Sequence, residues 1–116
     1  MKADMQDIQR SVCRRFGADY FSCDPNLKVG ISQNVRDGVR PLNGLRISPA
    51  GDTCGWYIWA GLEFSDAPDF FVPLHVSHLH AWAPLVWPYL GLPPGWRFLV
   101  TEQYEDVWRD DQLIQD

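Results

Sequence analysis

The sequence has no long hydrophobic run. Its longest unbroken apolar stretch is a few residues, far short of the ~20 residues that a membrane-spanning helix needs. The first residues, "MKADMQDIQRSVCRRFG", mix acidic and basic side chains and lack the apolar block of a secretory signal. We therefore expect a cytoplasmic protein that makes no contact with membranes.

Cysteine is scarce, and its number is odd. Cys13, Cys23 and Cys54 are widely spaced, which excludes a disulfide framework and a zinc site of the CxxC type within the chain. We expect buried, reduced thiols. A reactive thiol is an alternative, but no sequence feature marks one of the three as activated.

Positive charge is almost missing from the second half of the chain. Residues 59–116 hold only Arg97 and Arg109 against nine acids, whereas residues 1–58 hold eight Lys or Arg and six acids. An acidic field repels nucleic-acid phosphates and speeds encounters with basic proteins. The charge pattern therefore disfavours binding to DNA or RNA.

Catalytic motifs are also missing. The sequence contains no GxSxG, no P-loop, no dinucleotide-binding glycine pattern and no Cys/His nucleophile signature. Glu102, Glu105 and Asp106 offer pairs of carboxylates, but a catalytic pair needs opposed environments, and solvated carboxylates at strand edges are the better interpretation. We predict no catalytic residue and no cofactor.

All three histidines lie in the stretch "PLHVSHLHAW". On a helix His75 and His78 lie about 60° apart while His80 is about 160° from His78; on a strand His78 and His80 share a face. Either geometry gives a pair, whereas a catalytic zinc takes three protein ligands, and no recognised spacing supplies Asp69 or Glu63 as the third. We therefore predict no metal site and interpret His75 and His78 as structural groups bonded to backbone. A small metal-dependent hydrolase that uses these two histidines is the alternative.

Composition and periodicity predict one globular α+β domain over residues 1–116. Hydrophobic residues make up 46% of the chain and aromatic residues 14%, enough for a single core. An apolar stripe at helical spacing predicts a helix over about residues 4–16, ending before Gly17. Alternating residues predict a strand near 27–31, and β-branched and aromatic runs predict further strands near 56–64, 96–100 and 101–108. In the run 56–64, alternation predicts that Trp56, Ile58 and Ala60 face one side, and that Tyr57 and Trp59 face the other.

The segment between Ser65 and Gly91 is expected to be helical in short pieces, because Pro73, Pro84 and Pro88 interrupt it. The dipeptides Asp37-Gly38 and Asn43-Gly44 predict tight turns in a turn-rich connection, which a short strand follows. The tail after Asp110 predicts one capped helical turn. This order of elements favours an antiparallel sheet of about four to five strands with helices packed on one face.

Tryptophan and tyrosine are more numerous than so small a core needs, and they are common anchors of protein interfaces. Exposed aromatic residues close to acids would form a surface for recognition rather than a reaction centre. We predict a partner-binding surface made of an aromatic residue and six acids: Trp59, Glu63, Asp66, Asp69, Glu102, Glu105 and Asp106.

Three blocks of the sequence resemble a known family. They are "KVGISQNVRDGV" (28–39), "CGWYIWAGLEFSDAPDFFVPLHVSHL" (54–79) and "YLGLPPGWRFLVTEQYEDVW" (89–108). The chain is similar through these blocks to the Immunity protein 33 domain family of bacteria, over about residues 27–116. Where relatives often carry a second acid after the "WAG" segment, this chain has Leu62 before Glu63.

The resemblance implies an α+β domain among predicted immunity proteins of polymorphic toxin systems, which are encoded beside a toxin and neutralise it by binding. It implies no catalytic residues. Our leading hypothesis is a non-enzymatic immunity protein whose acidic, aromatic surface binds a cognate toxin with a basic face. A general protein-binding module unrelated to toxins is a further alternative.

Overall fold

The computed structural model describes residues 5–62 and 69–114, and its fold is α+β. Short helical pieces alternate with six strands. In chain order the elements are α1 (Met5–Phe16), β1 (Lys28–Ser32), η1 (Gln33–Val35), β2 (Leu42–Arg46), β3 (Thr53–Ala60), β4 (Phe71–His75), η2 (Val76–His78), α2 (Leu79–Trp82), η3 (Pro84–Tyr89), β5 (Trp96–Val100), β6 (Glu105–Arg109) and η4 (Asp111–Ile114).

The sheet has six strands in the order β4-β1-β3-β2-β5-β6, rather than the four to five that the sequence predicts. It is also mixed, because β1 and β3 are parallel while every other pair of neighbours is antiparallel. The parallel pair arises because β3 inserts between β1 and β2. A prediction from consecutive hairpins cannot anticipate such an insertion.

The additional strand, β4, lies where the sequence analysis expected helix. Phe71–His75 pairs with β1 at the edge of the sheet, and Pro73 lies opposite Gly30. Proline lacks a backbone N–H, and an edge strand tolerates this because one of its sides has no strand neighbour. The helical expectation is confirmed only from Val76 onward, and Ser65 and the residues up to Pro68 lie outside the described part.

The predicted N-terminal helix is confirmed as α1. Gln9, Val12 and Cys13 face the core, and Gly17 ends the helix with a φ of 73°. The amide of the next residue, Ala18, donates to the Cys13 carbonyl at 2.8 Å, which satisfies a carbonyl at the helix end.

One of the two predicted glycine turns is wrong. Asp37-Gly38 forms a turn with a φ of 79° at Gly38, but Asn43-Gly44 lies inside β2. A Cβ on Gly44 would collide with the Phe98 ring, which packs across β2 from the neighbouring strand β5. This glycine is therefore required for close packing and not for turn geometry.

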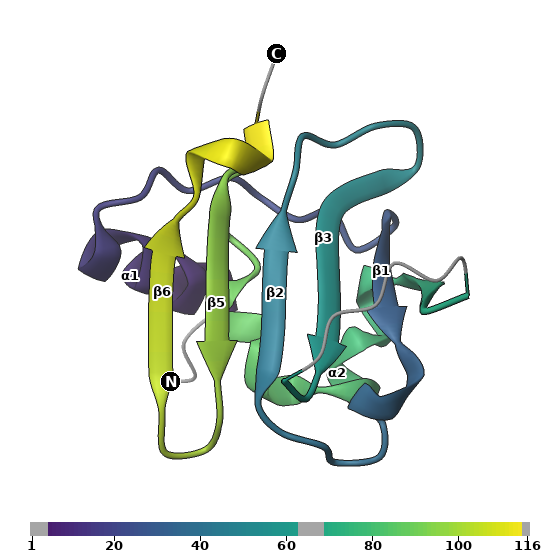
Figure 1. Cartoon of the computed structure of the whole chain (residues 1–116). Helices are drawn as coiled ribbons and strands as arrows, with labels where there is room; N and C mark the ends of the chain where they lie inside the picture. Colours follow the sequence, from purple (N-terminus) through teal and green to yellow (C-terminus); the bar gives the residue numbers. More distant parts are fainter. Residues whose placement is uncertain (1–4, 63–68, 115–116) are drawn as a thin grey trace.

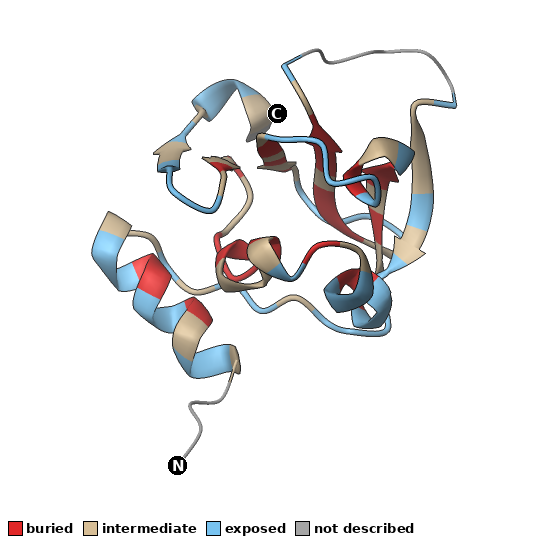
Figure 2. Cartoon of the chain, turned by 90° about the horizontal axis from the view of Figure 1, so that it is seen from below, coloured by how far each residue is buried: buried red, intermediate tan, exposed pale blue. Residues whose placement is uncertain are grey.

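The helical elements cover one face of the sheet, which Figure 1 shows with α1 and α2 behind the strands. In Figure 2 the buried residues, coloured red, lie where the sheet and the helical layer meet. On β3 the residues Trp56, Ile58 and Ala60 face this core, as predicted from alternation, and Tyr57 and Trp59 face the other side. Within the described residues no helix is long and apolar enough to cross a membrane.

Several loops with exposed side chains lie together at one end of the sheet. β1 and β3 end there, β2 and β4 begin there, and the β5–β6 hairpin turns there. We call this region the hairpin end, made of residues 33–41, 61–62, 69–70 and 101–104. In Figure 1 it is the lower edge of the sheet.

A buried arginine organises the opposite end. Arg46, the last residue of β2, is only 1% exposed. Its guanidinium donates to five backbone carbonyls at 2.8–3.1 Å, those of Phe21, Ser22, Cys54, Leu90 and Leu92. It also lies over the rings of Phe21 and Trp56, at 4.6 and 5.6 Å from their centroids. One side chain therefore ties β2 to β3, to the segment after α1 and to the segment after η3.

We predict that Arg46→Met lowers the free energy of unfolding by about 3–5 kcal/mol, because several buried carbonyls lose their donors while remaining in place. Arg46→Lys, with three donors in place of five, should lose less. Arg14→Met, at an exposed position of α1, should change the value by less than about 0.5 kcal/mol. Urea unfolding measures all three variants, and a loss below about 1 kcal/mol for Arg46→Met would contradict the role of Arg46.

Candidate functional site

The structure places every described member of the predicted surface at or beside the hairpin end. Trp59 is the penultimate residue of β3, and Asp69 lies two residues before β4. Glu102 lies in the β5–β6 hairpin, and Glu105 and Asp106 open β6. Residues 63–68, which include Glu63 and Asp66, lie outside the described part.

Strand register divides these residues between the two faces of the sheet. Trp59, Asn43, Leu99 and Asp106 stand in one cross-strand row, so Trp59 and Asp106 share the face without helices. Three strand spacings separate them by about 14 Å. Glu105 points to the opposite face, because successive side chains of a strand alternate. The acids therefore do not form one compact cluster.

Trp59 is buried although it lies on the face without helices. Its exposed fraction is 5%, and its ring centroid lies 6.3 Å from that of Phe71 on β4. In this conformation the indole supports the sheet and offers little area to a partner.

Glu105 is held within the protein by two partners. Both of its carboxylate oxygens accept from the Arg15 guanidinium at 2.9 Å, and the Tyr89 hydroxyl donates to Oε2. The hydrogen bonds from Arg15, with a smaller effect from Tyr89, lower the pKa of Glu105 below its ordinary value. Burial and the bond to Glu105 raise the pKa of Tyr89. Glu105 thus joins α1, η3 and β6.

Glu102 is paired in the same way. Arg40 Nη2 donates to its Oε2 at 2.8 Å, and Arg40 Nε lies 3.2 Å from both carboxylate oxygens. These bonds lower the pKa of Glu102. Two of the predicted acids therefore carry charge that a neighbouring cation already balances.

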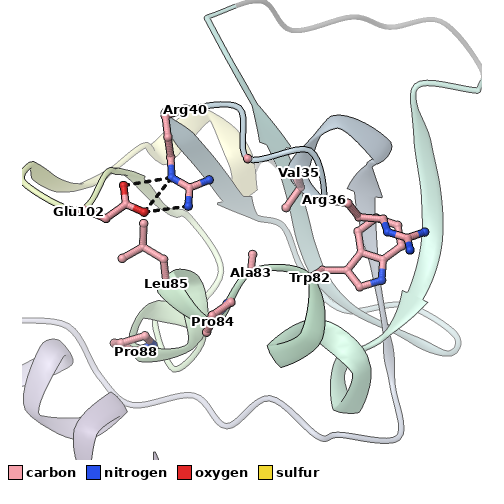
Figure 3. Close-up of a pocket in the computed structure, with 10 residues that line it drawn as sticks. Val35, Arg36, Arg40, Trp82, Ala83, Pro84, Leu85, Pro88 and Glu102 are labelled. Carbon is pink, nitrogen blue, oxygen red and sulfur yellow. Dashed lines mark hydrogen bonds and ion pairs between the residues drawn. The ribbon is translucent and has the colours of Figure 1, made fainter.

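A groove opens at the hairpin end beside the Arg40–Glu102 pair (Figure 3). Its volume is about 610 Å³, within the range of sites that hold a ligand or a partner side chain. The Arg36 guanidinium lies over the Trp82 ring, 4.8 Å from its centroid. The wall is mostly apolar and includes three charged residues: Val35, Arg36, Gly38, Arg40, Trp82, Ala83, Pro84, Leu85, Pro88 and Glu102.

A second hollow extends the groove towards β6. Its volume is about 340 Å³, and it shares Leu85 and Glu102 with the first. Its remaining lining comes from η3 and the β5–β6 hairpin: Tyr89, Thr101, Gln103, Tyr104 and Glu105. Because they share two residues, the two hollows form one concave band at the hairpin end.

Exposed apolar side chains concentrate at the same end. Val39, Leu62 and Tyr104 are 38%, 88% and 56% exposed, and all three belong to hairpin-end loops. Phe21, at 41%, is the other large hydrophobic residue exposed in the described part, and it is already stacked on Arg46. Exposed apolar residues rimmed by polar ones are typical of protein interfaces.

The histidines do not act as the structural groups that we expected. His75 and His78 are exposed, with ring centroids 5.9 Å apart, and neither caps the helical piece that it precedes. His80 is exposed and lies near the Trp87 ring. Among the described residues no three His, Cys, Asp or Glu side chains are grouped so that they could hold a metal ion.

Sequence reasoning missed the groove. Its walls come from residues 35–40 and 82–88, about 45 positions apart in the chain, and no local pattern brings them together. Tyr104 gave no signal either, because it falls within the segment 101–108 that the sequence predicts to be a strand.

We predict that Glu105→Gln flattens the acid sensitivity of the fold. A carboxyl whose folded pKa lies below its ordinary value of 4.5 stabilises the fold above that pH, and loses this effect as pH falls through the folded pKa. The contribution is about 1 kcal/mol or less, since the pair is partly exposed. Unfolding at pH 3 to 7 measures it, and Asp106→Asn, which removes a neighbouring carboxylate without an ion pair in the described part, is the control. Equal pH profiles for the two variants would contradict this prediction.

Comparison with known proteins gives one family. A family model described as "Imm33-like domain" matches residues 8–110, which include the groove and every described residue of the predicted surface. No curated protein and no solved structure matches the chain. Because this match extends over nearly the whole chain, the protein belongs to the Imm33-like domain family.

Proposed function

We propose that this protein is a non-enzymatic immunity protein of a bacterial polymorphic toxin system, and that it neutralises a cognate toxin by stoichiometric binding in the cytoplasm. Membership of the Imm33-like domain family supports the immunity role. We choose the hairpin end as the binding surface because the exposed apolar residues Val39, Leu62 and Tyr104 lie there, beside the groove.

The size of the hairpin end suits a protein partner. Asp69 precedes the edge strand β4 and Asp106 lies on the other edge strand, β6. Five strand spacings separate these edges by about 24 Å. A standard interface covers about 800 Å² on each partner, an area about 28 Å across, so a toxin domain can cover this end of the sheet.

The charge of the hairpin end favours a basic partner. Arg40 balances Glu102 and Arg15 balances Glu105. Asp37, Asp69 and Asp106 form no ion pair with any described residue, and at this end Arg36 also lacks an acidic partner in that same part of the chain. The excess of acid raises the encounter rate with a basic surface, and the apolar residues then form the dry centre of the contact.

The intramolecular ion pairs also prepare the surface for binding. Arg15, Arg40 and their carboxylate partners are long side chains, each of which loses conformational freedom when a partner orders it. Bidentate pairing orders them beforehand. The toxin then binds a preformed surface, and less of the binding free energy is lost in ordering side chains.

The first test is coexpression with the protein encoded beside this chain. We expect survival of cells that make the toxin, and a one-to-one complex on size exclusion. Tyr104→Asp should weaken the complex at least tenfold, because it places a charge in the apolar centre, whereas Ser48→Asp, on an exposed loop beyond the opposite end of β2, should leave it unchanged. The absence of protection and of any complex with a neighbour-encoded protein would reject the immunity role.

A second test addresses the acidic surface alone. We predict that Asp106→Lys lowers the association rate roughly three- to tenfold at low salt and reduces its dependence on salt. Asp7→Lys changes the net charge equally but lies in the first turn of α1, about 12 Å along the helix from Arg15. Stopped-flow mixing compares the two variants, and equal rates would remove Asp106 from the contact surface.

A further inference from the structure

Two of the three cysteines meet beside Arg46. Cys23 lies in the segment between α1 and β1, and Cys54 is the second residue of β3. Their side chains interact through a hydrogen bond. The Arg46 guanidinium donates to the carbonyls of Ser22 at 3.1 Å and Cys54 at 3.0 Å, so it holds together the two backbone segments that carry these thiols.

The pair is reachable from one side. Cys23 is half-buried and lines a cavity of about 460 Å³, whereas Cys54 is fully buried behind it. A small molecule that enters the cavity therefore meets Cys23 first.

The surroundings ease ionisation of the pair. The hydrogen bond from Cys23, the Trp56 backbone and the nearby Arg46 cation lower the pKa of Cys54 to about 7, although burial opposes them. The same hydrogen bond and burial raise the pKa of Cys23. Two coupled thiols lose their first proton as a unit. The thiolate therefore forms on Cys54, which can take the proton of Cys23, the residue that lines the cavity.

Cys13 is not part of this arrangement. It is buried on α1, and its thiol donates to the Gly91 carbonyl at 3.3 Å. Burial raises the pKa of Cys13, so Cys13 stays protonated and serves as an internal comparison.

We propose that Cys23 and Cys54 form a site of reversible oxidation, at which hydrogen peroxide entering the cavity converts the two thiols into an intramolecular disulfide. As its proton passes to the Cys54 thiolate, the Cys23 sulfur attacks one peroxide oxygen and breaks the O–O bond, giving a sulfenic acid and hydroxide, which takes up a proton as water. The Cys54 thiol then attacks the Cys23 sulfur and displaces the hydroxyl group as a second water. Two thiols are oxidised by two electrons and one molecule of hydrogen peroxide is reduced.

This site is separate from the surface proposed for toxin binding, because Arg46 lies at the end of β2 opposite the hairpin end. A failure of the proposed immunity role would therefore leave the oxidation of Cys23 and Cys54 unaffected. Neither thiol has an activating feature in the sequence.

The test treats the purified full chain with hydrogen peroxide under native conditions, blocks the remaining thiols and maps the peptides by mass spectrometry. We expect one blocked thiol per chain, at Cys13, and a Cys23–Cys54 disulfide that dithiothreitol reverses. The oxidised protein should keep the oligomeric state of the reduced protein and melt at least about 5 °C higher, since the bond closes a loop of roughly thirty residues in the unfolded chain.

Single variants give the controls. Cys13→Ser should form the disulfide at the rate of the unaltered protein, and Cys23→Ser should lose the rapid reaction while keeping two thiols. Because the mapping is done on the unaltered chain, misfolding of a variant does not affect the conclusion. The proposal is overturned if all three thiols survive in that chain, if the disulfide includes Cys13, or if only intermolecular disulfides appear.

Discussion

The rest of the structure depends on the buried guanidinium of Arg46. A charge in the core is costly unless hydrogen bonds replace its lost water, and here five carbonyls do so. Four of these carbonyls come from two irregular segments, whose backbones would otherwise need other partners. Trp56 adds a bond from its indole nitrogen to the Leu90 carbonyl at 3.1 Å. Arg46 thus allows short loops to lie in the core of a small domain with little regular helix.

The hairpin end follows from that anchoring. The segment after Leu90 is fixed by Arg46 and by the Cys13 thiol, which in turn fixes where η3 can pass under the sheet. η3 carries Leu85, Pro88 and Tyr89, so its path sets the wall of the groove and the position of the hydroxyl that bonds Glu105. The rigid end of the sheet therefore determines the shape of the end that is available for recognition.

The sequence predicts features that depend on neighbours in the chain and misses those that depend on distant ones. Alternation correctly assigns the faces of β3, and the helical stripe correctly locates α1. From its neighbours in the chain Gly44 is expected in a turn. Its actual role is to leave room for the ring of Phe98, a residue that is distant in the sequence. Arg46 looks like a solvated strand residue, because its five acceptors lie 8 to 46 positions away. The segment of β4 does not look like a strand because it contains a proline, which a strand tolerates only at a sheet edge. The sequence alone does not show which strand lies at the edge.

The same limit explains the predicted surface. Counting acids locates Glu102, Glu105 and Asp106 near one another, and the fold does bring them to one end of the sheet. Counting cannot show that Arg15, ninety residues before Glu105, neutralises it. A paired carboxylate contributes shape and order to an interface, whereas an unpaired one contributes long-range attraction. Recognition at this end therefore has two parts. The ion pairs and the groove determine which partner surface fits, and unpaired acids such as Asp106 determine the rate at which that partner associates.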